Sequence, residues 1–194
     1  MKKDYQILLF YSYAKILNPN KFKSDHHLFC INNNIKGRII ISKEGINGTV
    51  SGLIKDCDNY KKELISKKIF SDIDFKVEPY HKNAFKKINV RIKNEIVNSG
   101  IVKKRILHNK GKYINPSDFK KIINNKPEDV TILDVRSNYE HNIGKFKDAM
   151  TLDIDNFREF PNKINEIKKK IKKKNKIITY CTGGVKCEKA SGFL

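Results

Sequence analysis

The chain has 194 residues, of which 39% are hydrophobic and 10% aromatic, so it can bury the core of one domain or of two small ones. This composition excludes intrinsic disorder as the general class, and no stretch approaches the roughly 20 apolar residues that a membrane-spanning helix requires. A formal net charge of +20, from 41 Lys and Arg against 21 Asp and Glu, excludes an acidic chain. We predict two small domains.

The first half of the chain predicts an α+β domain over residues 1–93. Short apolar, aromatic and β-branched runs predict strands, at 6–11, 37–42, 48–51, 75–77 and 88–92. Two longer stretches predict helices, at 19–34 and 55–68. Between the second and third strands, residues 43–48 predict a turn, because their glycines and asparagine permit positive φ angles. The order strand, helix, two strands, helix, strand is that of a ferredoxin-like (acylphosphatase-like) sandwich.

Residues 94–114 are polar and contain two glycines, which predicts a linker. From 115 to 194 the pattern changes to strands alternating with helices, typical of an α/β domain with a parallel sheet. Strands are expected at 130–133 and 176–180, and an amphipathic helix is expected to begin near Pro161. The lysine run 168–174 either grips phosphates or forms a solvated helix face.

The segment best suited to chemistry follows the last predicted strand. Its residues are Cys181, Thr182, Gly183, Gly184, Val185, Lys186 and Cys187. A thiol attacks as its thiolate, and a free cysteine has a pKa of about 8.5, so a catalytic cysteine needs surroundings that stabilise negative charge. Paired glycines let successive backbone N–H groups turn inward as an anion-binding nest, and a helix beginning near Lys186 would add its N-terminal dipole. We therefore predict an anion-cradling loop with Cys181 as the catalytic residue and Lys186 as a nearby cation.

The other cysteines and the histidines are interpreted more simply. Cys30 and Cys57 are expected in the core. Cys187 either resolves an oxidised or persulfidated Cys181 or packs beneath the loop. The five histidines lack the spacing of Cys/His zinc sites, so no metal site is predicted. The absence of a secretory start predicts a cytoplasmic, reduced chain.

Several strings in the chain resemble one known family. DVRSNYE at 134–140, IGKFKDA at 143–149 and YCTGG at 180–184 resemble a rhodanese domain. EGINGTVSG at 44–52 and CTGGVKCEKAS at 181–191 resemble the rhodanese-containing tRNA uridine(34) hydroxylases. The resemblance implies an oxidoreductase that converts uridine 34, the wobble base of the anticodon, to 5-hydroxyuridine. It implies molecular oxygen as co-substrate, an unidentified electron donor, and tRNA as partner. The residues themselves show no ligand set for a flavin or a metal, so neither is predicted.

The resemblance also implies roles for individual residues. Cys181 matches the active-site cysteine, described in the family as a persulfide carrier. Asp134 and Arg136 match a pair that braces the fold, and Glu140 is expected to pair or cap nearby. The first-domain string forms either a tight turn or an edge that contacts RNA. The residues concerned are Glu44, Gly45, Asn47 and Gly48.

Two departures from the family pattern matter. Val185-Lys186 stands where the family usually has Ile-Arg, and an ammonium group lacks the planar donor fork of guanidinium. The family continues after the loop with a full helix and at least one more strand, whereas this chain ends at Leu194, so the second domain is expected to be truncated. Two alternatives to hydroxylation therefore stay open: a sulfurtransferase that carries a Cys181 persulfide, and an inactive tRNA-binding remnant.

The excess of positive charge bears on the partner in two ways. A positive surface potential attracts phosphate backbones, which fits tRNA, and anionic membranes. The chain is also rich in Lys, Asn and Ile, a combination that biased nucleotide composition in the genome would produce. Charge alone therefore does not choose the partner.

Overall fold

The chain forms two compact units, and the boundary between them along the sequence lies between Ile96 and Val97. The computed structural model describes residues 3–101, 110–125, 127–167, 171 and 176–194. Residues 102–109 of the predicted linker, and the predicted lysine run apart from Ile171, lie outside the described residues. Within the described residues, no helix is both long and apolar enough to cross a bilayer.

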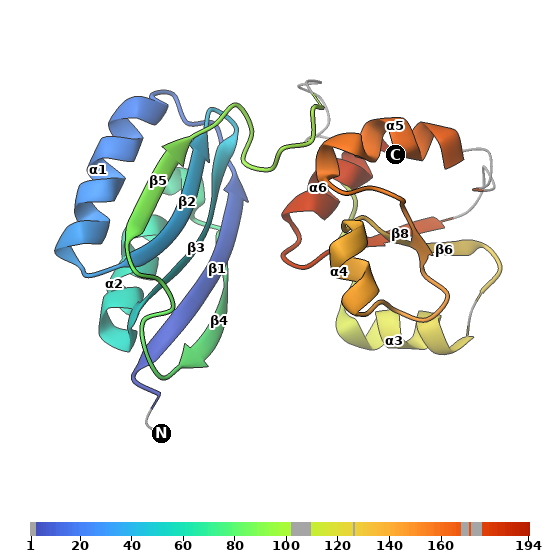
Figure 1. Ribbon diagram of the computed structural model, residues 1–194, viewed down its shortest axis with the longest axis horizontal. Helices are drawn as coiled ribbons and strands as arrows, with labels where there is room; N and C mark the ends of the chain where they lie inside the picture. The colour runs from blue at the N-terminus through green and yellow to red at the C-terminus, as the bar shows by residue number, and fades with distance from the viewer. Residues whose placement is uncertain (1–2, 102–109, 126, 168–170, 172–175) are drawn as a thin grey trace. The chain divides into compact units, whose positions relative to one another are not determined.

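The first unit is a five-stranded sheet with two helices packed on one face (Figure 1). Its elements are β1 (Tyr5–Tyr13), α1 (Pro19–Asn32), β2 (Lys36–Ser42), β3 (Gly45–Leu53), α2 (Ile54–Ser66), a 3₁₀ turn (Lys68–Phe70), β4 (Asp74–Tyr80) and β5 (Ile88–Ile92). The strand order is β4-β1-β3-β2-β5. Strand β5 runs parallel to β2, and the other neighbours are antiparallel. The predicted ferredoxin-like α+β sandwich is confirmed, with β5 as an additional edge strand.

Alternation along the strands separates the two faces of this sheet. Leu8 and Phe10 of β1 point toward the helices and are at most 1% exposed, together with Ile39 and Ile41 of β2. Tyr60 and Leu64 of α2 complete this core, as do both cysteines of the unit, Cys30 and Cys57, which confirms their predicted core position. Because side chains alternate along a strand, the odd-numbered residues of β1, including Tyr5 and Tyr11, lie on the opposite face.

The turn between β2 and β3 is shorter than predicted. It consists of Lys43 and Glu44, and the next residue, Gly45, already pairs with Tyr13 of β1. Gly45 has a φ of 148°, and a Cβ atom added there would lie 2.0 Å from the carbonyl oxygen of Ser12. Glycine therefore allows the β1 backbone to pass against the start of β3.

The second unit is a three-stranded parallel sheet flanked by helices on both sides (Figure 1). Its elements are α3 (Pro116–Asn125), β6 (Val130–Asp134), α4 (Asn138–Ile143), β7 (Met150–Thr151), a 3₁₀ turn (Phe157–Glu159), α5 (Phe160–Ile167), β8 (Lys176–Tyr180) and α6 (Val185–Phe193). The strand order is β7-β6-β8. Leu133, Leu152, Phe160 and Ile164 form its core. The predicted α/β class is confirmed, while α3, α4 and β7 were not predicted.

Candidate active site

Cys181 lies at the carboxyl end of β8, where the chain turns into α6. Helix α6 begins at Val185, one residue before the predicted start, and its N-cap is Gly184 with a left-handed φ of 95°. This conformation directs the Gly184 N–H toward the sulfur of Cys181, at 3.0 Å. The backbone N–H groups of Gly183 and Cys187 also donate to this sulfur. The loop therefore forms the predicted nest of amides around a half-buried thiol.

Cys187 is the strongest single influence on the Cys181 thiol. Its side chain hydrogen-bonds Cys181, and together with the three backbone donors this lowers the pKa of Cys181 to about 6, against the opposing effect of burial. The same hydrogen bond, followed by burial, raises the pKa of Cys187 well above its usual range. Cys187 thus keeps its proton and donates a hydrogen bond from its S–H to a Cys181 thiolate. At pH 7 Cys181 is therefore mainly a thiolate.

Lys186 does not face the sulfur in the way that we expected. Its Nζ lies 2.6 Å from Oε2 of Glu140, at the N-terminal end of α4. The Thr182 hydroxyl donates to the other oxygen of the same carboxylate at 2.7 Å. Glu140 therefore anchors both sides of the loop to α4, and the role predicted for the Lys186 cation belongs to the Cys187 thiol.

Glu140 also organises the start of its own helix. The backbone N–H of Ser137 donates to Oε2 at 3.2 Å, and the Ser137 hydroxyl donates at 3.0 Å. Partial burial favours the neutral acid, but hydrogen bonds from Lys186, Thr182 and Ser137 outweigh it and lower the pKa of Glu140 to about 2. Ser137 was not among the predicted site residues, although the spacing Ser-x-x-Glu is the sequence signal of a capping box.

Asp134 and Arg136 form the brace that the resemblance implied. Asp134 is fully buried, and the Arg136 guanidinium donates to it through Nε at 2.9 Å and Nη2 at 2.7 Å. The hydroxyl of Tyr180 donates to the same carboxylate at 2.6 Å. Burial favours protonation of Asp134, but these donors hold its pKa below the usual range. Because Tyr180 directly precedes Cys181, the brace fixes the end of β8 and hence the origin of the loop.

The first-unit string at residues 44–48 is engaged within its own unit. The Glu44 carboxylate accepts the backbone N–H of Ile96 at 2.8 Å, and the Asn47 side chain donates to the Ile96 carbonyl at 2.9 Å. Ile96 is fully buried. Gly45 and Gly48 are buried too, and a Cβ on Gly48 would lie 2.7 Å from the Phe10 ring. Residues 44–48 thus hold the backbone of the last residue of the first unit in place. Their contact with RNA stays a prediction.

One hollow in the second unit lies away from the Cys181 loop. It has a volume of about 310 Å³ and runs along α3, the first half of β6, and β7. Its lining residues are Ile122, Ile123, Pro127, Val130, Thr131, Ile132, Lys147, Asp148 and Met150. None of them belongs to the Cys181 loop. No cluster of three or more His, Cys, Asp or Glu suited to a metal occurs among the described residues.

The two units match two family models in chain order. Residues 5–96 match the UPF0176 acylphosphatase-like domain, and residues 115–194 match the rhodanese-like domain. The chain belongs to the family that joins these two domains. Its Cys181 loop lies in the rhodanese-like part, and its 44–52 string lies in the UPF0176 part.

Relatives of the chain share the name tRNA uridine(34) hydroxylase. The relative from Cytophaga hutchinsonii is 47% identical over 192 residues, which cover 99% of this chain and 60% of the relative. Those from Staphylococcus haemolyticus and Acholeplasma laidlawii are 46% and 42% identical, covering 98% and 100% of this chain and 59% and 60% of theirs. The chain thus spans about three fifths of the relatives that it matches. The solved BLUF protein BlrB is 18% identical, with a TM-score of 0.40 over 47% of this chain and 74% of that one.

Proposed function

We propose that this chain contributes the thiol chemistry of a cytoplasmic tRNA hydroxylase, which converts uridine 34 of the anticodon to 5-hydroxyuridine. The observation that carries the proposal is the nest around Cys181, in which the Gly184 N–H lies 3.0 Å from the sulfur and further loop amides and the Cys187 thiol donate to it, which lowers the pKa of Cys181. The proposed substrate and reaction are supported by 47% identity to a relative named tRNA uridine(34) hydroxylase. The rhodanese-like part supplies the loop.

A thiolate provides a direct way to activate C5 of a pyrimidine. In the proposed route the Cys181 sulfur adds to C6 of uracil, which forms a C6–S bond and places the displaced electron pair on C5 and O4. C5 then attacks an oxygen donor at the peroxide level and takes one oxygen atom, while the other leaves as water. Loss of the C5 proton and breakage of the C6–S bond restore the C5–C6 double bond and the thiolate.

The electrons in this route balance through an external reductant. Molecular oxygen accepts two electrons and two protons to reach the peroxide level, and a two-electron donor supplies those electrons. Uridine, oxygen, two electrons and two protons therefore give 5-hydroxyuridine and water. The role of the protein is to hold the nucleophile as a thiolate, which the loop amides and the Cys187 thiol favour by lowering the pKa of Cys181.

The proposal is tested by nucleoside analysis of tRNA. Cells that lack their native activity would express this chain or its Cys181→Ser variant, and the tRNA would be digested and analysed by mass spectrometry. We expect 5-hydroxyuridine with the unchanged chain and none with Cys181→Ser, since a serine hydroxyl stays protonated at neutral pH. Equal amounts with both chains would refute a role for the thiolate. Binding of tRNA without product would assign the chain as a tRNA-binding remnant.

Sulfur transfer is a second candidate, favoured by the rhodanese-like part and by the nest of donors around Cys181. A thiolate that attacks the outer sulfur of thiosulfate releases sulfite and keeps the sulfur as a persulfide, which the same donors would stabilise. Incubation with thiosulfate would then add one sulfur to the Cys181 peptide and release sulfite in equal amount. Transfer to an acceptor, without 5-hydroxyuridine in tRNA, would favour this candidate over hydroxylation.

A further inference from the structure

The sheet face opposite α1 and α2 has a composition unlike that of the core face. Strand pairing brings alternate residues of all five strands onto it, in rows that cross the sheet. One row contains Lys76, Leu9, Thr49, Arg38 and Asn89, and the next contains Asp74, Tyr11, Asn47, Ile40 and Arg91. We call this surface the tyrosine face, after its most frequent aromatic residue.

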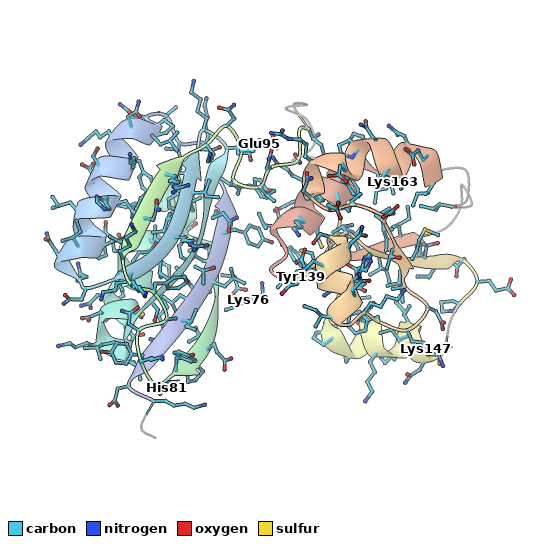
Figure 2. The ribbon with its side chains drawn as sticks, in the orientation of Figure 1. Lys76, His81, Glu95, Tyr139, Lys147 and Lys163 are labelled. Atoms are coloured by element: carbon cyan, nitrogen blue, oxygen red, sulfur yellow. The ribbon has the colours of Figure 1, made fainter. Side chains whose placement is uncertain are left out.

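Four tyrosines and four basic residues lie on the tyrosine face. The tyrosines are Tyr5, Tyr11 and Tyr13 of β1 and Tyr80 of β4, and all four are half-buried. The basic residues are Lys36 and Arg38 of β2, Lys76 of β4 and Arg91 of β5, and the last three are exposed. Only two acidic residues, Asp74 and Glu78 of β4, share the face. Figure 2 shows Lys76 on the side of the sheet away from the helices.

The spacing of these groups suits a strand of nucleic acid. Neighbouring strands of a sheet are about 4.8 Å apart, wider than the roughly 3.4 Å between stacked bases, so residues in one row suit unstacked, splayed bases. Arg38 and Lys76 lie on either side of β1 and β3 in a single row, while the rings of Tyr11 and Tyr13 lie 6.1 Å apart, edge to face. Rings accept unpaired bases regardless of sequence, and cations beside them contact the phosphates.

A protein partner fits this face less well. The cations lie toward the edges of the face, with Lys76 on β4, Arg38 on β2 and Arg91 on β5, so positive charge borders the tyrosines of β1 on both sides. The face of the sheet that packs against α1 and α2 differs in composition, since it presents apolar side chains such as Leu8, Phe10 and Ile41, which are at most 1% exposed. Mixed aromatic and basic composition, in a chain of net charge +20, favours a polyanion that also offers flat rings.

We propose that the tyrosine face binds a single-stranded segment of RNA, with tyrosine rings stacked on unpaired bases and with Arg38, Lys76 and Arg91 on phosphates. The inference rests on the proposed function in taking an unpaired loop of tRNA as that segment. Asn47 lies in a central row, so the RNA contact predicted for it would belong to this face. The first unit is thereby the substrate-binding part and the second the reactive part.

The test compares two triple variants of the chain with the same change in charge. In one, Arg38, Lys76 and Arg91 on the tyrosine face become Glu, and in the other the exposed Lys55, Lys62 and Lys68 on the helix side become Glu. Binding of unmodified tRNA is measured by fluorescence anisotropy at several salt concentrations. We expect the face variant to bind at least about tenfold more weakly, with a salt slope shallower by about 2, and the control to change far less.

Aromatic variants test stacking separately. Tyr11→Phe keeps the ring and should bind tRNA like the unchanged chain, whereas Tyr11→Ala should lose about tenfold in affinity. Thermal melting confirms that each variant is folded, and the charge variants change only exposed residues. Equal tRNA affinity of the two triple variants would overturn the inference. So would unchanged affinity with a shift in gel-filtration volume, because the face would then join two copies of the chain.

The same variants separate this inference from the proposed hydroxylation. If the unchanged chain binds tRNA through the tyrosine face but forms no 5-hydroxyuridine, the inference stands and the proposed function fails. If the face variant forms as much 5-hydroxyuridine as the unchanged chain, the inference fails and the proposed function stands.

Discussion

At the scale of single residues, the reactivity of Cys181 depends on a second thiol. Backbone amides alone surround many helix N-termini, but here a protonated Cys187 makes the largest contribution to ionising the sulfur. We predict that Cys187→Ala raises the pKa of Cys181 toward the usual thiol range and slows its alkylation at pH 6 to 7. Cys187→Ser retains an O–H donor and should keep the low pKa. The pH dependence of the iodoacetamide reaction rate measures both.

The other two cysteines, Cys30 and Cys57, should not contribute to the measured iodoacetamide reaction. Burial raises the pKa of Cys30 to about 12 and that of Cys57 to about 11, so neither reacts appreciably near neutral pH while the unit is folded. Peptide mapping would confirm that the label is on Cys181. The same alkylation profile for Cys187→Ala and the unchanged chain would show that the amides suffice.

Glu140 provides a second prediction at this scale. Its pKa is lowered to about 2, below the ordinary value of 4.5, so its contribution to stability is complete above about pH 4.5 and is lost as pH falls toward 2. The side chain is 24% exposed, and solvent screening reduces the contribution to about 1 to 2 kcal/mol. We expect Glu140→Gln to lower the free energy of unfolding by that amount at pH 7. Chemical unfolding at pH 7 and pH 3 checks this, because the difference between variant and unchanged chain should shrink at pH 3.

At the scale of elements, the sequence predicts those whose signal is local and periodic. Strand β1 and helix α5 are evident from their apolar spacing, and the β8–Cys181 junction follows from the β-branched run before the loop. Helix α4, with six residues, and β7, with two, are too short to show a period. The hydrogen bond between Cys181 and Cys187 depends on α6 beginning at Val185, because the first turn of that helix brings residue 187 close to the loop. A separation of six residues in the sequence does not by itself predict this hydrogen bond.

The β2–β3 connection gives a prediction at this scale. Because Gly45 has a φ of 148° and its Cβ position lies against the Ser12 carbonyl, Gly45→Ala must displace β1 or β3. We expect a loss of at least about 2 kcal/mol in the free energy of unfolding. Gly144→Ala is the matched control, since no atom lies within 4 Å of its Cβ position, and it should change stability little. Equal melting temperatures for the two variants would show that an alanine at position 45 is not strained.

At the scale of the whole molecule, the chain has two separate cores with different acid-sensitive groups. The first unit buries His26, which is 2% exposed. Its Nε2 lies 2.9 Å from the Tyr60 hydroxyl, and its Nδ1 has no hydrogen-bond partner among the described residues. The second unit depends on carboxylates, Glu140 and the fully buried Asp134, whose pKa values are lowered. A histidine kept neutral and a carboxylate kept charged lose their contributions in different pH windows, so mild acid should weaken the first unit before the second.

Burial, assisted by the Lys67 charge, lowers the pKa of His26 from 6.5 to about 4, so unfolding takes up a proton between these values. The stability of the first unit is therefore complete above about pH 6.5 and should fall by about 3 kcal/mol as pH drops to 4. His26→Phe keeps an aromatic ring against Phe22 and leaves the Tyr60 hydroxyl unpaired, which lowers stability at all pH values but should flatten its slope between pH 6.5 and 4.5. Hydrogen exchange of β1 and β3 peptides measures that slope, with His27→Gln as the control that should retain it. A slope unchanged in His26→Phe would assign the acid sensitivity to other groups.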